Sequence, residues 1–209
     1  MQASRRIIPS RNVREFFRDS VGEALSKQSL QAEDHTVHYV VELLTGFTRA
    51  EEFHETGQET RARTLRPLAL MLNDAVDAPT EAERDRAMRR LGDVALFVAG
   101  FFPDVFARRS VDVDYCIRMG GGAYSWLAER SRHSSQVRAY GGIFSELSEK
   151  FAMFVEVLGE ISDLGRSYTS ADVLRLYELW IRTGSPRADR RLRELGIQTA
   201  PGAVSRLEH

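Results

Sequence analysis

The stretch Cys116–Arg130, CIRMGGGAYSWLAER, places three consecutive glycines inside a segment with the hydrophobic spacing of a helix. The apolar residues on either side of the glycines keep one phase, so an unbroken helix carries them within about 120° of arc. Three glycines inside a helix cost roughly 2–3 kcal/mol relative to alanine, which implies a reason for the missing side chains. The stretch therefore predicts a helix that another part of the protein, or a ligand, approaches closely at Gly120–Gly122.

A phosphate-binding loop is the first alternative for these glycines. Such a loop needs a strand before the glycines and a helix N-terminus with Lys, Ser or Thr after them. Here helical residues precede the glycines, and Ala123 and Tyr124 follow them. The chain also has no Gly-x-Ser-x-Gly elbow and no Walker-type Gly-Lys-Ser/Thr sequence, so the common hydrolase and nucleotide-binding signatures are missing.

The next helical segment carries a stripe of small residues that suits close packing on the glycines. An antiparallel hairpin turning near His133 would bring Gly121 level with Ser145 and Ser125 level with Gly141. Close packing of the two helices is the favoured interpretation, and the alternative is a ligand pocket left open by the small residues. The predicted lining of that pocket is Tyr115, Gly121, Tyr124, Ser125, Trp126, Tyr140, Gly141 and Phe144.

The rest of the chain shows helical periodicity almost everywhere and strand-like alternation almost nowhere. The predicted fold is all-α, an irregular single-domain bundle of seven to eight helices over residues 10–196, with flexible tails at 1–9 and 197–209. Local signals set several boundaries: Thr80 and Glu83 form a capping box, and Gly184 suits a helix C-terminus. The longest predicted helix covers residues 135–162. The final Leu-Glu-His resembles the remnant of an affinity tag.

Composition restricts the setting of the protein. Hydrophobic residues make up 43% of the 209 residues, charged residues 28%, and the formal net charge is −1. The single cysteine, Cys116, excludes disulfide frameworks and is expected to be a buried structural thiol. Without a secretory signal or an apolar run long enough to span a bilayer, the sequence predicts a cytoplasmic protein of bacterial type with no membrane partner.

Two groups of residues have the spacing of metal ligands. His35, His38 and Glu42 share one helical face, but that face lies opposite the apolar one, which favours a solvated surface. Glu51 and His54 form a Glu-x-x-His pair that resembles, over four residues, the ligand pattern of ferritin-like carboxylate-bridged enzymes. This pair enters the core only if the helix continues past Gly46, and the chain offers no second copy outside its tag-like end.

Two further sets of charged residues favour a structural interpretation. Asp112 and Asp114 diverge on a helix, and the helix macrodipole accounts for Asp112. Arg187, Arg190 and Arg191 share one face of the last helix, where they are expected to form a solvated surface. No aromatic residue lies among these arginines and the whole chain is slightly acidic, so nucleic-acid binding is disfavoured.

The leading functional prediction is a non-catalytic binding or protein-interaction module of regulatory type. Its partner would be another protein, a second copy of the chain, or a small apolar ligand. The alternative is an enzyme, either metal-dependent with carboxylate and histidine ligands at Glu51 and His54, or acting on a small molecule in the aromatic-lined pocket. The sequence identifies no catalytic residue and no cofactor.

Overall fold

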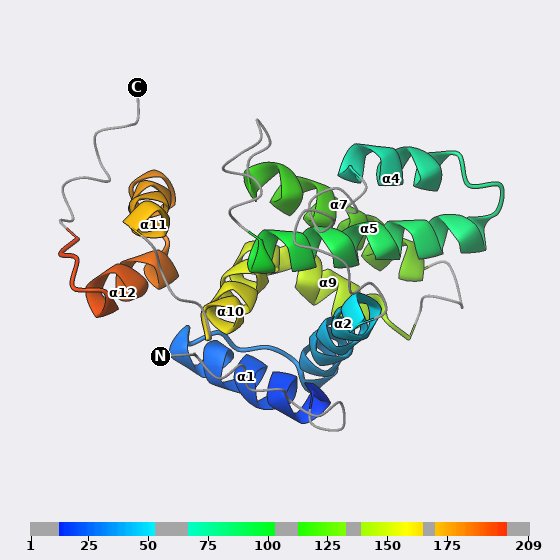
Figure 1. Ribbon diagram of the computed structural model, residues 1–209. Coiled ribbons are helices and arrows are strands. Elements are labelled where there is room, and N and C mark those ends of the chain that lie inside the picture. Colours follow the sequence, from blue (N-terminus) through cyan, green and yellow to red (C-terminus); the bar gives the residue numbers. More distant parts are fainter. Residues whose placement is uncertain (1–12, 53–66, 103–112, 133–138, 165–169, 200–209) are drawn as a thin grey trace. The chain divides into compact units, whose positions relative to one another are not determined.

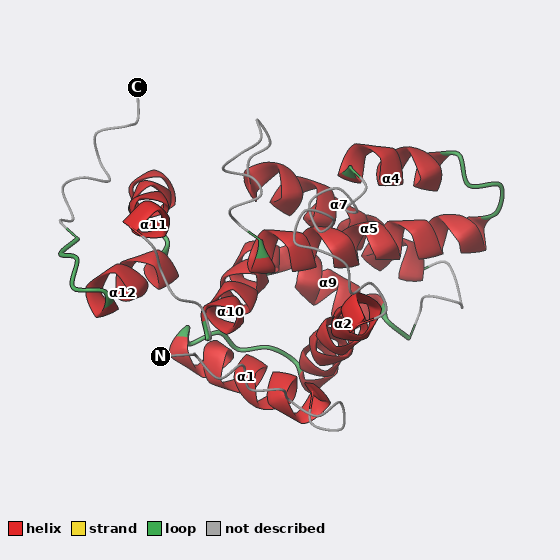
Figure 2. Ribbon diagram, in the orientation of Figure 1, coloured by secondary structure: helices red, strands yellow, loops and turns green. Residues whose placement is uncertain are grey.

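A computed structural model describes residues 13–52, 67–102, 113–132, 139–164 and 170–199, and the described part of the chain is all-helical (Figure 1). Figure 2 shows helices joined by loops, with no strand among the described residues. The helices are α1 (Val13–Lys27), α2 (Asp34–Glu52), α4 (Leu68–Val76), α5 (Glu81–Phe101), α7 (Val113–Ser131), α9 (Gly141–Glu149), α10 (Phe151–Asp163), α11 (Ser170–Thr183) and α12 (Pro186–Glu194). No helix among them has the length and hydropathy needed to cross a membrane.

The chain divides into two compact units, residues 1–158 and 159–209, and α10 contributes to both. In the first unit, α7 packs against α5 and α9, α4 lies along α5, and α1 contacts α2. In the second unit, α11 packs against α12. The all-α fold is confirmed, whereas the single domain over residues 10–196 stays a prediction.

The glycine stretch is helical throughout, as predicted, and other helices approach it closely. A Cβ atom on Gly120 would lie 2.6 Å from Cε2 of Phe151 and 2.8 Å from Cβ of Ala95. Gly121 is less crowded, since its Cβ would lie 3.7 Å from that of Phe151, and Gly122 has no neighbour within 4 Å. Gly120 is therefore the position at which α5, α7 and α10 require a missing side chain.

The predicted register between the two helices is wrong, by three residues at Gly121 and by six at Gly141. Ser148, rather than Ser145, lies level with Gly121, and its hydroxyl donates a hydrogen bond of 3.1 Å to the Gly121 carbonyl. Gly141 lies against Ser131 rather than Ser125, because a Cβ on Gly141 would be 2.9 Å from the Ser131 Cβ. Gly141 and Ser131 are both small, so α9 begins close to the end of α7. Each residue of α7 therefore faces a residue of α9 that comes later in the sequence than predicted.

The longest predicted helix is interrupted, which explains why nine helices are described instead of seven to eight. Lys150 lies between α9 and α10 with φ −106° and ψ 20°, outside ideal helical geometry. Its Nζ donates to the Gln31 carbonyl at 2.8 Å and to Glu146 Oε1 at 2.7 Å. Lys150 is thus bonded both to a distant loop and to its own helix, and Phe151 directly after it packs on Gly120.

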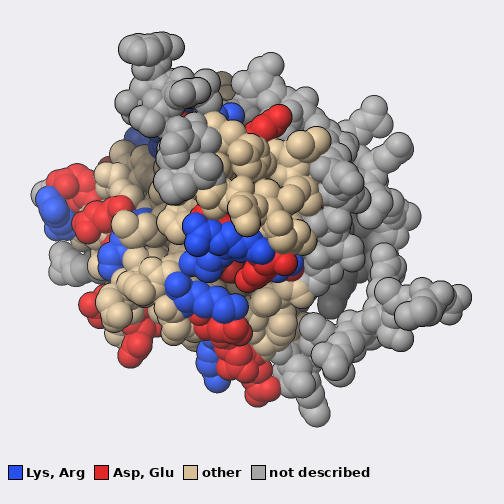
Figure 3. All heavy atoms as spheres, turned by 90° about the vertical axis from the view of Figure 1, so that its left-hand side faces the viewer, with Lys and Arg blue, Asp and Glu red and all other residues tan. Residues whose placement is uncertain are grey.

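In the second unit, one arginine of the predicted solvated face is buried. Arg187 is 7% exposed, and its Nε donates to Asp163 Oδ2 at 2.9 Å. Gly159 makes room for the guanidinium, because a Cβ there would lie 2.5 Å from Arg187 Cζ. Arg190 pairs with Glu160 and Arg191 with Glu194. The face shown in Figure 3 has acidic and basic side chains side by side. The prediction of an ordinary solvated face is thus wrong for Arg187.

Candidate ligand site

Three helices of the first unit meet at the carboxylate of Asp93 on α5. The hydroxyl of Tyr39, on α2, donates to Asp93 Oδ1 at 2.5 Å. The hydroxyl of Tyr124, on α7, donates to the same oxygen at 2.8 Å. Asp93 therefore links α2, α5 and α7 through two hydrogen bonds on one oxygen.

The local sequence creates the space for this arrangement. Gly92 directly precedes Asp93, and a Cβ on it would lie 2.7 Å from Cε1 of Tyr124. The missing side chain lets the Tyr124 ring lie flat on α5, so that its hydroxyl reaches the next residue of that helix. Tyr124 is fully buried, and its ring stacks on Phe144 with 5.7 Å between centroids.

Burial controls the protonation of these groups. Burial raises the pKa of Asp93 above its ordinary value, although the two tyrosine hydroxyls and Arg89 act in the opposite direction. Burial and the nearby Asp93 also raise the pKa of Tyr39 and of Tyr124 well above that of a free tyrosine. Both tyrosines therefore remain neutral hydrogen-bond donors near neutral pH.

Arg89 connects this cluster to the surface. Its Nε donates to the Tyr39 hydroxyl at 3.0 Å and lies 3.9 Å from Asp93 Oδ2. Its guanidinium lies over two aromatic rings, 5.0 Å from the centroid of Tyr39 and 5.1 Å from that of Tyr140. The side chain is 44% exposed, so the aromatic contacts fix its direction while its end stays accessible.

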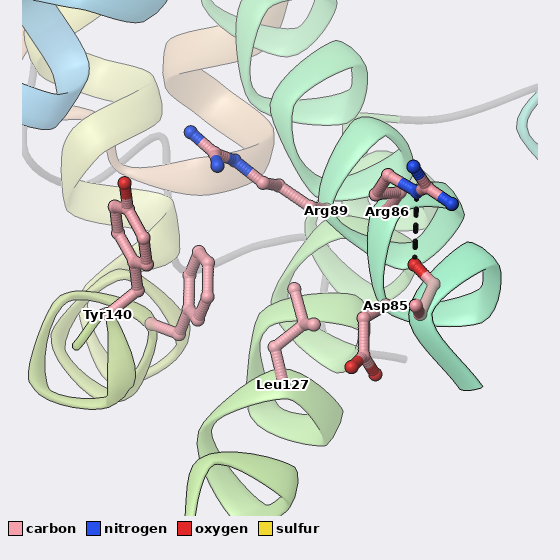
Figure 4. A pocket seen from close by; sticks show the side chains of 7 residues that line it. Asp85, Arg86, Arg89, Leu127 and Tyr140 are labelled. Carbon is pink, nitrogen blue, oxygen red and sulfur yellow. Dashed lines mark hydrogen bonds between the residues drawn. The ribbon is translucent and has the colours of Figure 1, made fainter. Parts of the chain in front are cut away.

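A pocket of about 320 Å³ lies beside this arginine, and Figure 4 shows Arg89 and Tyr140 at one side of it with Leu127 and Asp85 at the other. Its volume is at the lower end of the roughly 300–1,000 Å³ that small-molecule pockets occupy. The lining residues are Ala82, Asp85, Arg86, Arg89, Leu127, Tyr140 and Phe144. The pocket thus combines an apolar wall with two cations and one carboxylate.

The carboxylate of the pocket is held by α7. Asp85 is 5% exposed, and its Oδ1 accepts a hydrogen bond of 3.1 Å from Nε of Arg130. Arg130 also pairs with the exposed Glu81, one turn earlier on α5. The second oxygen of Asp85, Oδ2, is buried and has no hydrogen-bond partner among the described residues. A buried acceptor without a partner is costly, but this oxygen has almost no accessible surface and is therefore closed off from the pocket.

The structure brings only part of the predicted pocket together. Tyr140 and Phe144 line the pocket, and Tyr124 lies beneath it, stacked on Phe144. Gly121 contacts Phe151, and Gly141 contacts Ser131, so both glycines belong to helix packing instead.

Three other predicted residues, Tyr115, Ser125 and Trp126, do not line the pocket either. Ser125 is exposed, and Tyr115 and Trp126 are half-buried. Arg130 lies over the Trp126 ring at 5.9 Å, so Trp126 supports the arginine that holds Asp85. Cys116 is buried, as predicted.

The two groups of predicted metal ligands lie on or just after α2. His35, His38 and Glu42 are exposed on α2, which confirms the predicted solvated face, and Glu42 pairs with Arg14 at 2.5 Å. α2 runs unbroken past Gly46 and includes the backbone of Glu51, while the Glu51 side chain and His54 lie outside the described residues. Within the described ranges, no group of three potential ligands could hold a metal ion.

Sequence reasoning missed the four polar residues that organise the site: Tyr39, Asp85, Arg89 and Asp93. One signal was available, since Asp93 is the only charged residue in the otherwise apolar run LGDVALFVAGFF, Leu91–Phe102. Asp85 and Arg89 belong to the charged segment ERDRAMRR, where sequence alone does not separate buried from solvated positions.

A scan of protein-family models, a search of curated proteins and a search of solved structures each give no match to this chain. The fold and the site define an all-helical protein with a small pocket lined by polar and aromatic residues.

Proposed function

We propose that this protein is a non-catalytic binding protein whose pocket takes a small carboxylic acid with an aromatic or other apolar body. The observation that carries the proposal is the placement of Arg89 in the pocket wall. Its Nε is occupied by Tyr39, while its two terminal nitrogens have no hydrogen-bond partner among the described residues. The planar fork of arginine matches the two oxygens of a carboxylate.

The aromatic contacts of Arg89 support binding because they order the side chain before a ligand arrives. An exposed arginine loses much rotamer freedom when it binds, and a side chain fixed in advance loses less. Arg89 lies over the rings of Tyr39 and Tyr140, and its Nε is hydrogen-bonded to Tyr39. These contacts fix the orientation of the guanidinium before a ligand binds.

The apolar part of the ligand has a wall of its own. Leu127 and Phe144 are buried residues that also line the pocket, and Tyr140 stacks on Phe144 with 5.9 Å between centroids. Tyr140 is 38% exposed, and contact with its ring removes apolar ligand surface from water. An anionic group at Arg89 and an apolar group on Tyr140 together describe a compact aromatic acid.

The test is calorimetric titration with 3-phenylpropanoate, using the neutral 3-phenylpropan-1-ol as the comparison ligand. We expect the acid to bind at least about tenfold more tightly than the alcohol, because a hydrogen bond to a charged group contributes roughly 1.5–3 kcal/mol. Arg89→Gln should remove that preference.

Arg86→Gln is the matched control, because it makes the same charge change at the rim of the same pocket. The Arg86 side chain is exposed and bonds back to its own helix, with Nε donating to the Ala82 carbonyl at 3.2 Å. This variant should keep the preference for the acid. Equal binding of acid and alcohol by the wild type, or no binding of either, would overturn the proposal, and neither result depends on a variant that folds poorly.

A further inference from the structure

We propose that this site binds its organic anion together with a proton, which Oδ2 of Asp93 takes up from solvent as the anion pairs with Arg89. The affinity for the anion would then rise as pH falls. This inference rests on the proposed function, because it concerns how the same site is regulated.

The first argument is that Arg89 already has a carboxylate beside it. Its Nε lies 3.9 Å from Oδ2 of Asp93, and the Tyr39 hydroxyl joins the two residues, accepting from Arg89 and donating to Asp93. An ionised Asp93 partly offsets the charge of the guanidinium and repels a second anion at the terminal nitrogens. Protonation of Asp93 removes both effects, so the anion and the proton favour each other's binding.

The second argument is that the hydrogen bonds of Asp93 leave one oxygen for the proton. Oδ1 accepts from Tyr39 at 2.5 Å and from Tyr124 at 2.8 Å. Oδ2 can therefore carry a proton without displacing either tyrosine hydroxyl. The Asp93 side chain is largely buried but keeps 23% of its surface exposed, so solvent can supply the proton.

The third argument concerns the charged and titratable groups around Asp93. Burial raises the pKa of its carboxyl above the ordinary value, while the hydroxyls of Tyr39 on α2 and Tyr124 on α7 and the charges of Arg89 and Arg90 on α5 lower it. Of these four residues, Arg89 alone lines the pocket. An anion that pairs with Arg89 weakens one of the influences that keep Asp93 ionised, which shifts Asp93 toward its protonated form.

The experiment measures the affinity of the full chain for 3-phenylpropanoate at neutral pH, by calorimetric titration of the wild type and of Asp93→Asn. The amide carries no charge and keeps an oxygen for the two tyrosine hydroxyls. We expect the variant to bind at least about threefold more tightly, because the repulsion from Asp93 is gone. A gain in affinity does not arise from a poorly folded variant.

The wild-type affinity is then followed as a function of pH. We expect it to rise about threefold or more between about pH 8 and about pH 5, and to show no such rise in Asp93→Asn. Protonation of the ligand carboxyl lowers affinity in this range, so the expected rise has the opposite sign. His35 and His38, exposed on α2, are present in both proteins, so any contribution from them would persist in the variant.

Glu81→Gln is the matched control. It removes the same charge from α5, at a side chain that is 75% exposed and does not line the pocket. Solvent screens a charge at such a position, so this variant should bind 3-phenylpropanoate as the wild type does and with the same pH profile.

The outcomes separate the two proposals. If 3-phenylpropanoate binds with the expected dependence on Arg89, but a folded Asp93→Asn binds it no more tightly or the wild-type affinity stays flat or falls toward low pH, the proton inference fails and the carboxylic-acid site stands. If the wild type does not bind 3-phenylpropanoate, both proposals fail. If thermal scans show that Asp93→Asn is unfolded, the wild-type pH profile decides alone.

Discussion

The two ends of the interface between α5 and α7 differ in what lies between the helices. At one end, Gly120 of α7 has Ala95 of α5 and Phe151 of α10 so close that no Cβ would fit without movement. At the other end, about two helical turns later along α7, Leu127 lines a pocket with Arg89 and Phe144.

The difference shows what side-chain size does along one helix face. Gly120 and Leu127 lie on the same side of α7, because seven residues are close to two full turns. Where the residue is glycine, the side chains of Ala95 and Phe151 reach its backbone; where it is leucine, the side chain is fully buried and lies at the edge of a pocket. The glycine stretch therefore anchors the closed end of the interface and does not line the pocket.

The largest expected effect comes from filling the closed end with Gly120→Ala. The new methyl group would overlap the Phe151 ring and the Cβ of Ala95, which is fixed to the backbone of α5. Overpacking of this kind costs about 1–3 kcal/mol, partly offset by up to about 1 kcal/mol of improved helix propensity. The melting temperature should fall by several degrees in a thermal unfolding scan.

A smaller change in stability, of opposite sign, is expected from the corresponding substitution at Gly122. Gly122 is exposed and a Cβ there has no neighbour within 4 Å, so Gly122→Ala gains helix propensity without a clash. The free energy of unfolding should rise by about 0.5–1 kcal/mol in urea titrations. If both alanine variants shift stability in the same direction, the contrast between a crowded and an open glycine is wrong.

Much of the fold follows from local signals in the sequence. The capping box of Thr80 and Glu83 is formed, and α5 begins directly after it. Gly184 ends α11 with φ 65°, a conformation that glycine adopts without strain. These features depend on neighbours within one turn, which is why the sequence predicts them. No local pattern indicates the break between α9 and α10, where Lys150 bonds to the distant Gln31 carbonyl.

The candidate site is less predictable because its residues are brought together by contacts between distant parts of the sequence. Tyr140 and Phe144 were found because aromatic residues beside a small-residue stripe indicate a cavity. Arg89 is one of many arginines in α5, and its role depends on Tyr39, which lies 50 positions away in the sequence. Only the pairing of helices distinguishes it from Arg86, three residues earlier on the same helix.

The smallest expected effect is on the pH dependence of stability and comes from Asp93, which lies on α5 between Ala95 and Arg89. Its pKa in the folded protein is raised above the ordinary value of 3.8 because the carboxyl is buried. As pH rises from that ordinary value through the folded pKa, the unfolded chain loses the proton first, so the folded state binds more protons and its stability falls. Above the folded pKa, the penalty is constant.

Asp93→Asn removes this titration and keeps an oxygen for the hydroxyls of Tyr39 and Tyr124, which both bond to Oδ1. The free energy of unfolding of the variant, relative to the wild type, should therefore increase as pH rises from about 4 and then level off. Urea titrations across this range measure the slope, with Asp114→Asn, an exposed position on α7, as the control. A constant offset at all pH values would mean that Asp93 stabilises the bundle only through its two hydrogen bonds.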